Sequence, residues 1–147
     1  NVLFLPSALF LLFLGRFVAG KRVGEYLGYC FQIKDDIFDY FKEANIGKPT
    51  GNDIREGKVT LPLLYALRQG REEEAARYLD MILRKDFAAE NVDSLIEFAK
   101  ANGGIEYAEA RMKEYHDKAV DVLLRLPESE ARISLIQLAD YIMTRSK

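Results

Sequence analysis

The segment FQIKDDIFD, residues 31–39, lies inside a stretch of helical apolar spacing, residues 22–41, that predicts a long helix. At about 100° per residue, Asp35 and Asp39 fall one turn apart on the same helical face, with Asp36 beside them. Like charges at this spacing cost roughly 0.2 to 0.5 kcal/mol per pair, so the helix gains nothing from the cluster unless a cation neutralises it. Taken alone, the cluster fits either a solvated helix face or a divalent-metal site.

The other metal-binding residue types narrow the choice of metal. The chain has one cysteine, Cys30, and one histidine, His116, which excludes an intrachain disulfide and a His/Cys zinc site. We expect Cys30 to be a buried thiol and His116 to be a surface residue. Carboxylates without these ligands favour magnesium or calcium, and magnesium typically takes one or two carboxylates and completes its shell with water and substrate phosphate. The metal hypothesis is therefore a Mg2+ site that shares a diphosphate.

A polar loop that is rich in glycine, residues 46–60, follows the acidic helix. Lys48 and Lys58 are cations on this flexible backbone and could close over phosphate groups, while Asp53 could bind a metal-bound water. The loop does not match a P-loop, because Pro49 stands where a P-loop has Ser or Thr. By itself the loop is weak evidence of function.

Helical spacing continues through the rest of the chain, and we expect an all-α helical bundle that forms one domain over residues 1–147. Helices are predicted over residues 72–84 and 104–126, and a shorter one begins at Asn91. Ser129 is expected to cap a last helix. The inward-facing residues of that last helix are predicted to be Leu135, Leu138 and Ile142.

The composition supports a folded protein that does not bind nucleic acid. The chain has 147 residues, of which 49% are hydrophobic and 30% charged, with a net charge of -2. A protein that neutralises phosphates along a nucleic acid is usually basic, so we expect no nucleic-acid partner.

An apolar run at residues 2–14 is shorter than the roughly 20 residues that a membrane-spanning helix needs. We expect a buried helix there, with membrane-surface contact or a surface exposed by truncation as the alternatives. Because we see no targeting pattern and only one cysteine, we expect a cytoplasmic protein.

Three motifs together resemble a known family. They are Gly28-x-x-Phe31-Gln32-x-x-Asp35-Asp36-x-x-Asp39, then Gly47-Lys48-x-x-Gly51-x-Asp53, then Gly57-Lys58-x-Thr60-x-Pro62. This order closely resembles the second aspartate-rich region of the trans-type polyprenyl diphosphate synthases. The resemblance is tightest over residues 28–67 and covers roughly 24–147, whereas residues 1–23 match the family poorly.

The resemblance implies the C-terminal portion of an isoprenoid-synthase fold, which joins an allylic diphosphate to isopentenyl diphosphate with the help of magnesium. It also implies a role for each matching residue. Asp35 would be the main ligand of one magnesium ion, supported directly or through water by Asp36 and Asp39. Asp53 would also serve the metal. The residues assigned to the substrates are Lys48 and Lys58 for the allylic diphosphate, Gln32 for stabilising the allylic cation through its amide oxygen, and Phe31 for packing nearby.

The chain departs from that family by lacking the first, facing aspartate-rich motif, and family members are normally much longer. We therefore expect an isolated chain with little or no prenyl transfer, a homo-oligomer, and transient membrane contact because the product is a lipid. One alternative is a non-catalytic subunit that binds magnesium and diphosphate or completes a partner's site. A structural helical protein is a second alternative, and a terpene cyclase is a third.

Overall fold

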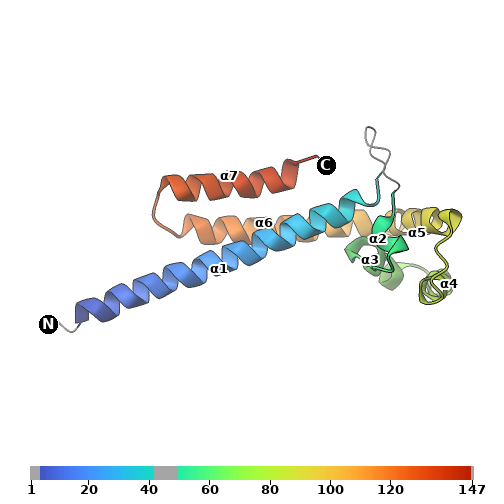
Figure 1. The fold of residues 1–147 in the computed structure, drawn as a ribbon, viewed down its shortest axis with the longest axis horizontal. Helices are drawn as coiled ribbons and strands as arrows, with labels where there is room; N and C mark the ends of the chain where they lie inside the picture. Colours follow the sequence, from blue (N-terminus) through green and yellow to red (C-terminus); the bar gives the residue numbers. More distant parts are fainter. Residues whose placement is uncertain (1–3, 42–49, 147) are drawn as a thin grey trace. The chain divides into compact units, whose positions relative to one another are not determined.

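The protein is all-helical in a computed structural model, which describes residues 4–41 and 50–146, with side chains from residue 15 onward. The described residues form helices and no strand, which confirms the predicted all-α class (Figure 1). The helices are α1 (Phe4–Phe38), α2 (Asn52–Arg55), α3 (Leu61–Gln69), α4 (Glu72–Leu83), α5 (Ala89–Ala101), α6 (Gly104–Leu124) and α7 (Glu130–Thr144).

Two boundaries differ from the sequence-based expectation. α1 begins at Phe4, so the N-terminal apolar run and the acidic segment belong to one helix of 35 residues. The predicted loop 46–60 contains the short helix α2. Periodicity alone misses α2, because four residues are too few to show an apolar stripe.

The chain divides into two compact units, and α1 and α6 contribute to both. Unit 1 comprises residues 1–31 and 112–146, and unit 2 comprises residues 32–111. The expectation of a single domain over residues 1–147 stays a prediction.

Unit 1 is a packing of three helices around a small apolar core. Its buried side chains are Val23, Leu27 and Cys30 of α1, Met112, Ala119 and Leu123 of α6, and Ala139 and Ile142 of α7. Cys30 donates to the carbonyl oxygen of Met112 at 3.3 Å, and burial raises the pKa of its thiol to about 11. The thiol is therefore protonated at neutral pH, in agreement with the expected buried cysteine.

α7 folds back along α6 within unit 1 (Figure 1). Ser129 caps α7 as predicted, because its hydroxyl accepts the backbone N–H of Arg132 at 3.1 Å. Of the residues expected to face inward, only Ile142 is buried, whereas Leu135 and Leu138 are exposed. The contact that buries Ala139 and Ile142 is narrower than the apolar face of the helix, and this part of the prediction is wrong.

His116 links α6 to α7 and is not the surface residue that we expected. Its side chain is 17% exposed, with Nε2 2.7 Å from Asp140 of α7 and Nδ1 3.0 Å from Asp117. Burial of the imidazole lowers its pKa, but the hydrogen bonds to Asp117 and Asp140 raise it more, so the pKa lies above its ordinary value.

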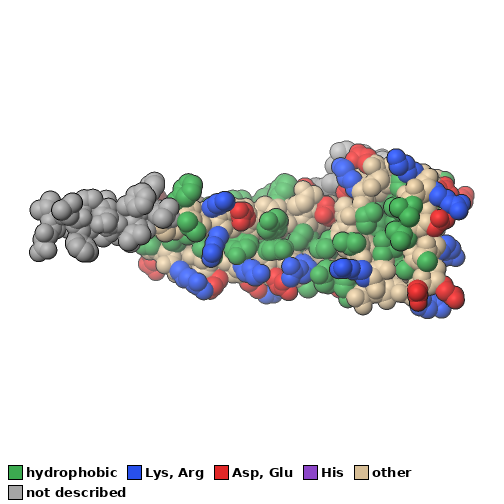
Figure 2. Space-filling model, turned by 90° about the horizontal axis from the view of Figure 1, so that it is seen from below, with side chains coloured by type: hydrophobic (Ala, Val, Ile, Leu, Met, Phe, Trp, Pro, Cys, Tyr) green, Lys and Arg blue, Asp and Glu red, His purple; other side chains and the backbone are tan. Residues whose placement is uncertain are grey.

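Several large apolar side chains of unit 1 remain exposed, among them Phe17, Leu124 and Tyr141. Figure 2 shows apolar side chains among charged ones on one face of the protein. No described helix is both long and apolar enough to cross a membrane.

Unit 2 is built around α3, which packs against α4 and α5. Its most deeply buried side chains include Tyr40, Ile54, Leu63, Val92 and Leu95. Two aromatic pairs complete the packing: Tyr65 lies over Tyr107 with ring centroids 4.1 Å apart, and Tyr78 contacts Phe98 at 4.5 Å. This core holds the end of α1, through Ile33 and Ile37, beside α2 and α5.

The raised pKa of His116 predicts a pH-dependent stability of unit 1. A histidine whose folded-state pKa exceeds its unfolded value stabilises the fold fully below the unfolded pKa, and this contribution is lost as the pH rises through the folded pKa. We expect the melting temperature to fall between about pH 6 and pH 8, and Asp140→Asn to flatten that fall.

Melting curves recorded across this pH range test the prediction. Asp121→Asn is the matched control, because Asp121 pairs with Arg125 at 2.7 Å and arginine keeps its charge throughout. An Asp140→Asn variant that retains the full pH dependence of the wild type would contradict the role of His116.

Candidate functional site

Two of the three acidic residues at the end of α1, Asp35 and Asp36, are only partly covered, whereas Asp39 is buried. Ile33 and Ile37 are buried, whereas Asp35 and Asp36 are half-buried. At about 100° per residue, Asp35 lies on the side of the helix opposite Ile33 and Ile37, and Asp36 lies at the edge of their apolar face. Of the predicted acidic patch, Asp35 and Asp36 are therefore partly exposed on the folded chain.

Gln32 lies within this patch and donates from Nε2 to Oδ1 of Asp36 at 2.9 Å. Burial raises the pKa of Asp36, the bond from Gln32 opposes this, and the charges of Asp53, Asp35 and Asp39 raise the pKa further. The net pKa lies above the ordinary aspartate value. Three neighbouring carboxylates thus act on Asp36, and a cluster of negative charge of this kind attracts a cation.

Asp39 has a different environment from its neighbours, because it is buried and bonded to α2. Its Oδ1 accepts the backbone N–H of Asn52 at 3.0 Å, and its Oδ2 accepts that of Asp53 at 3.1 Å. Its own carbonyl oxygen accepts the N–H of Gly51 at 2.9 Å. The end of α1 therefore holds the start of α2.

The glycines at the two ends of α2 have structural roles. Gly51 and Gly57 adopt left-handed conformations with φ of 79° and 80°. At the C-terminal end, the N–H of Gly57 bonds to Ile54 O at 2.9 Å and that of Lys58 bonds to Asp53 O at 2.8 Å, which together form a Schellman motif. Within residues 50–60, the expected flexible loop is a capped helical turn, and that part of the prediction is wrong.

The turn brings Lys58 to the carboxylate of Asp53. Lys58 Nζ lies 2.8 Å from Glu56 and 3.9 Å from Asp53, and its side chain is 61% exposed. The hydrogen bond to Glu56 is the main reason why the pKa of Lys58 is raised. The ammonium group is therefore charged and open to an anionic ligand. Lys48, the other predicted diphosphate-binding lysine, lies outside the described residues.

Tyr40 and Thr60 form a hydrogen bond that the sequence analysis did not predict. The Tyr40 hydroxyl lies 2.9 Å from Thr60 Oγ1, and burial raises the pKa of Tyr40 to about 12. Thr60 precedes α3 and makes no side-chain cap of that helix. Consecutive residues at the end of α1 therefore hold the starts of the next two helices.

Phe31 belongs to unit 1, where Arg145 lies over its ring with the guanidinium 4.2 Å from the ring centroid. Arg145 also donates to the Phe31 carbonyl oxygen at 3.4 Å. The end of α7 is thus tied to α1 one residue before Gln32.

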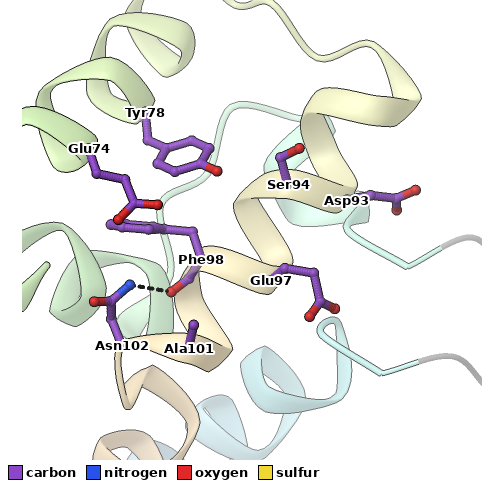
Figure 3. A pocket seen from close by; sticks show the side chains of 8 residues that line it. All are labelled: Glu74, Tyr78, Asp93, Ser94, Glu97, Phe98, Ala101 and Asn102. Atoms are coloured by element: carbon purple, nitrogen blue, oxygen red, sulfur yellow. Dashed lines mark hydrogen bonds between the residues drawn. The ribbon is translucent and has the colours of Figure 1, made fainter.

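A hollow of about 500 Å³ lies elsewhere in unit 2, between α4 and α5 (Figure 3). Its lining includes Tyr78 and Phe98, the acidic residues Glu74 and Glu97, and Asn102, whose side chain donates to Phe98 O at 2.9 Å. It contains none of the residues that the sequence motifs single out. The motif chemistry therefore lies at the end of α1 and not in this hollow.

Among residues 15–41 and 50–146, no group of three or more Asp, Glu, His or Cys side chains is arranged to hold a metal ion by itself. Fewer protein ligands are enough for magnesium, which needs only one or two carboxylates when a diphosphate and water complete its shell. Asp35 and Asp36 supply hard oxygen donors of the right type. The donor set fits magnesium bound together with a diphosphate.

Comparison with known proteins assigns this chain to a family. The sequence profile described as Polyprenyl synthetase matches residues 3–99, which include the acidic end of α1 and the whole of α2. The chain belongs to this family. The match includes residues 3–23, so the resemblance reaches further toward the N-terminus than the sequence analysis expected.

Individual relatives agree with the family assignment. The octaprenyl diphosphate synthase of Haemophilus influenzae is 41% identical over 124 residues, which are 84% of this chain and 37% of that protein. The heptaprenyl diphosphate synthase component 2 of Bacillus subtilis is 37% identical over 123 residues, which are 83% of this chain and 34% of that protein. The chain thus spans little more than a third of these curated relatives.

A solved structure shows the same fold. The polyprenyl synthase of Caulobacter crescentus, in a crystal structure complexed with calcium and isoprenyl diphosphate, matches with a TM-score of 0.79 and 32% identity. The match covers 90% of this chain and 40% of that one. The fold of this polyprenyl synthetase family member therefore matches part of an all-helical polyprenyl synthase.

The two glycines that flank α2 predict unequal losses in the free energy of unfolding when each is replaced by alanine. Gly57→Ala adds only the strain of a left-handed alanine, about 1 to 2 kcal/mol, because the space around Gly57 is open. Gly51→Ala adds the same strain and a collision of the new Cβ with Val92, so we expect a loss of about 2 to 5 kcal/mol. Urea unfolding measures both, and equal losses would contradict the close packing of α2 on α5.

Proposed function

We propose that this chain is the C-terminal portion of a polyprenyl diphosphate synthase, which condenses an allylic diphosphate with isopentenyl diphosphate using Mg2+. One observation carries the proposal: the acidic end of α1 is held against a capped turn that carries Asp53 and Lys58. In a member of the polyprenyl synthetase family, this arrangement sets oxygen ligands and a cation side by side, as a metal-bound diphosphate requires.

Each residue then has a distinct task. Asp35 and Asp36 would hold the magnesium, with Asp53 reaching it through water. Lys58, together with Lys48, would bind the allylic diphosphate. When bound, magnesium would supply electrostatic stabilisation of the departing diphosphate.

The hydrogen bond of Gln32 to Asp36 supports the role that the resemblance assigns to Gln32. A carboxylate accepts hydrogen bonds and cannot donate them, so the amide group of Gln32 that faces Asp36 is the –NH2 group. The amide oxygen is then the atom left to face a positive charge, such as that on the allylic carbon. Phe31, the preceding residue, would pack near the same carbon chain.

The isolated chain is proposed to have little or no activity, because it spans 37% of the octaprenyl relative and contains one aspartate-rich motif. Exposed apolar residues of unit 1, such as Phe17 and Leu124, favour association with another copy. We propose a homo-oligomer, a cytoplasmic location, and transient membrane contact for release of a lipid product.

A second candidate function is that of a subunit that binds magnesium and diphosphate and completes a partner's site. The name of the Bacillus subtilis relative, heptaprenyl diphosphate synthase component 2, favours this alternative. Co-purification with a protein that carries the missing aspartate motif would support it.

Calorimetric titration of the full chain with inorganic diphosphate, with and without Mg2+, tests the site. We expect magnesium-dependent binding that weakens by at least about ten-fold in Asp35→Ala, because a lost ligand costs no less than a lost outer-shell partner. Asp93→Ala is the matched control, since it removes an exposed aspartate of α5 in the same unit.

Incubation with a labelled allylic diphosphate, isopentenyl diphosphate and Mg2+ then tests the reaction. We expect no elongation by the chain alone. Elongation that disappears in Asp35→Ala would show a complete site and contradict the proposed incompleteness. If the folded chain bound no diphosphate in the presence of Mg2+, the proposed function would be wrong.

A further inference from the structure

We propose that Asp39 is a positioning residue, whose carboxylate holds the start of α2 and so ties Asp53 to the acidic end of α1. The resemblance assigns Asp39 to the metal, whereas its contacts lead to a different task. The task depends on the proposed function only in that Asp53 and Lys58 serve a diphosphate.

The first step concerns the atoms that Asp39 engages. Its side chain is 8% exposed, and its two oxygens accept different backbone N–H groups, Asn52 at 3.0 Å and Asp53 at 3.1 Å. The first N–H groups of a helix have no acceptor within that helix. Asp39 satisfies two of them with charge-assisted hydrogen bonds.

The second step explains why the residue that caps α2 lies outside the N-cap position of that helix. The N-cap of α2 is Gly51, which has no side chain to accept a hydrogen bond. A residue with a Cβ is disfavoured there, because φ is 79° and the Cβ would collide with Val92 of α5. The usual Ser, Thr, Asp or Asn cap is thus excluded from position 51, and the cap must be supplied from outside.

The third step connects the cap to the site. α2 carries Asp53, and the Schellman motif at its other end places Lys58 Nζ 3.9 Å from that carboxylate. Fixing the start of this short helix therefore fixes both charged groups. The hydrogen bond from the Asp53 N–H to Asp39 Oδ2 at 3.1 Å ties Asp53 to the acidic end of α1.

The fourth step distinguishes Asp39 from the two other aspartates of the motif. Asp35 and Asp36 are half-buried and accessible to an ion with its water shell. Asp39 is nearly covered, and each of its oxygens already faces an N–H donor. A metal ion would have to displace these donors, leaving the start of α2 without acceptors.

Amide hydrogen exchange of the full chain, measured by NMR without metal, tests the cap. We expect Asp39→Ala to speed exchange of the Asn52 and Asp53 amides by about ten-fold or more, because each loses its acceptor. Asp39→Asn keeps one acceptor oxygen and should protect one of the two amides. Asp35→Ala is the matched control and should leave both amides unchanged.

Binding of Mg2+ with inorganic diphosphate, measured by calorimetry, tests the link to the site. We expect Asp39→Ala to weaken binding about as much as Asp53→Ala, and the double variant to bind no more weakly than Asp53→Ala. Asp39→Asn should fall between the wild type and Asp39→Ala. If Asp39 stabilised the fold without positioning Asp53, the double variant would bind more weakly than Asp53→Ala.

Two results would overturn the proposal. One is unchanged exchange at Asn52 and Asp53 in Asp39→Ala. The other is a double variant in which the two losses multiply, since independent effects mean that Asp39 contacts the metal itself. Slow exchange of the Leu95 and Ile96 amides of α5 in each variant shows that the variant is folded. If Asp39→Ala unfolds, the results for Asp39→Asn decide whether the proposal holds. A wild-type chain without affinity for diphosphate would refute the proposed function, and exchange alone would then decide the role of Asp39.

Discussion

Burial of the Asp39 carboxylate against the start of α2 is the interaction on which the site depends. A buried charge is tolerated only when it is paired or hydrogen-bonded, and the two backbone N–H groups of α2 supply those bonds. The bonds in turn fix a four-residue helix that is too short to be stable alone. The acidic end of α1 and the turn that carries Asp53 therefore form one structural element, although residues 42–49 separate them in sequence.

The packing of unit 2 makes this arrangement specific. Gly51 lets the backbone of α2 approach Val92 of α5, and α5 is held by α3. The hydrogen bond between Tyr40 and Thr60 attaches the start of α3 to the same end of α1. Contacts with residues far along the chain thus position a site whose charged groups come from two short segments.

Electrostatic repulsion explains why the acidic residues need the buried, hydrogen-bonded residues Asp39 and Tyr40 beside them. Burial is the main reason why the pKa of Asp36 is raised, and the negative charges of Asp53, Asp35 and Asp39 raise it further. Rigid attachment of this kind keeps like charges together against their repulsion. These supports belong to a chain that covers only about two fifths of a solved relative.

The sequence by itself determined the helical class, the family and the acidic patch, because these depend on local spacing and on motifs. It also predicted the Ser129 cap and the helix α4, which local signals specify. The tertiary structure decided what individual side chains contact. In the folded chain, His116 bonds to Asp140 and the carboxylate of Asp39 accepts a backbone N–H of α2. The segment expected to be a flexible loop contains the capped helix α2. These contacts join residues that are far apart in sequence, and helical periodicity carries no information about such partners.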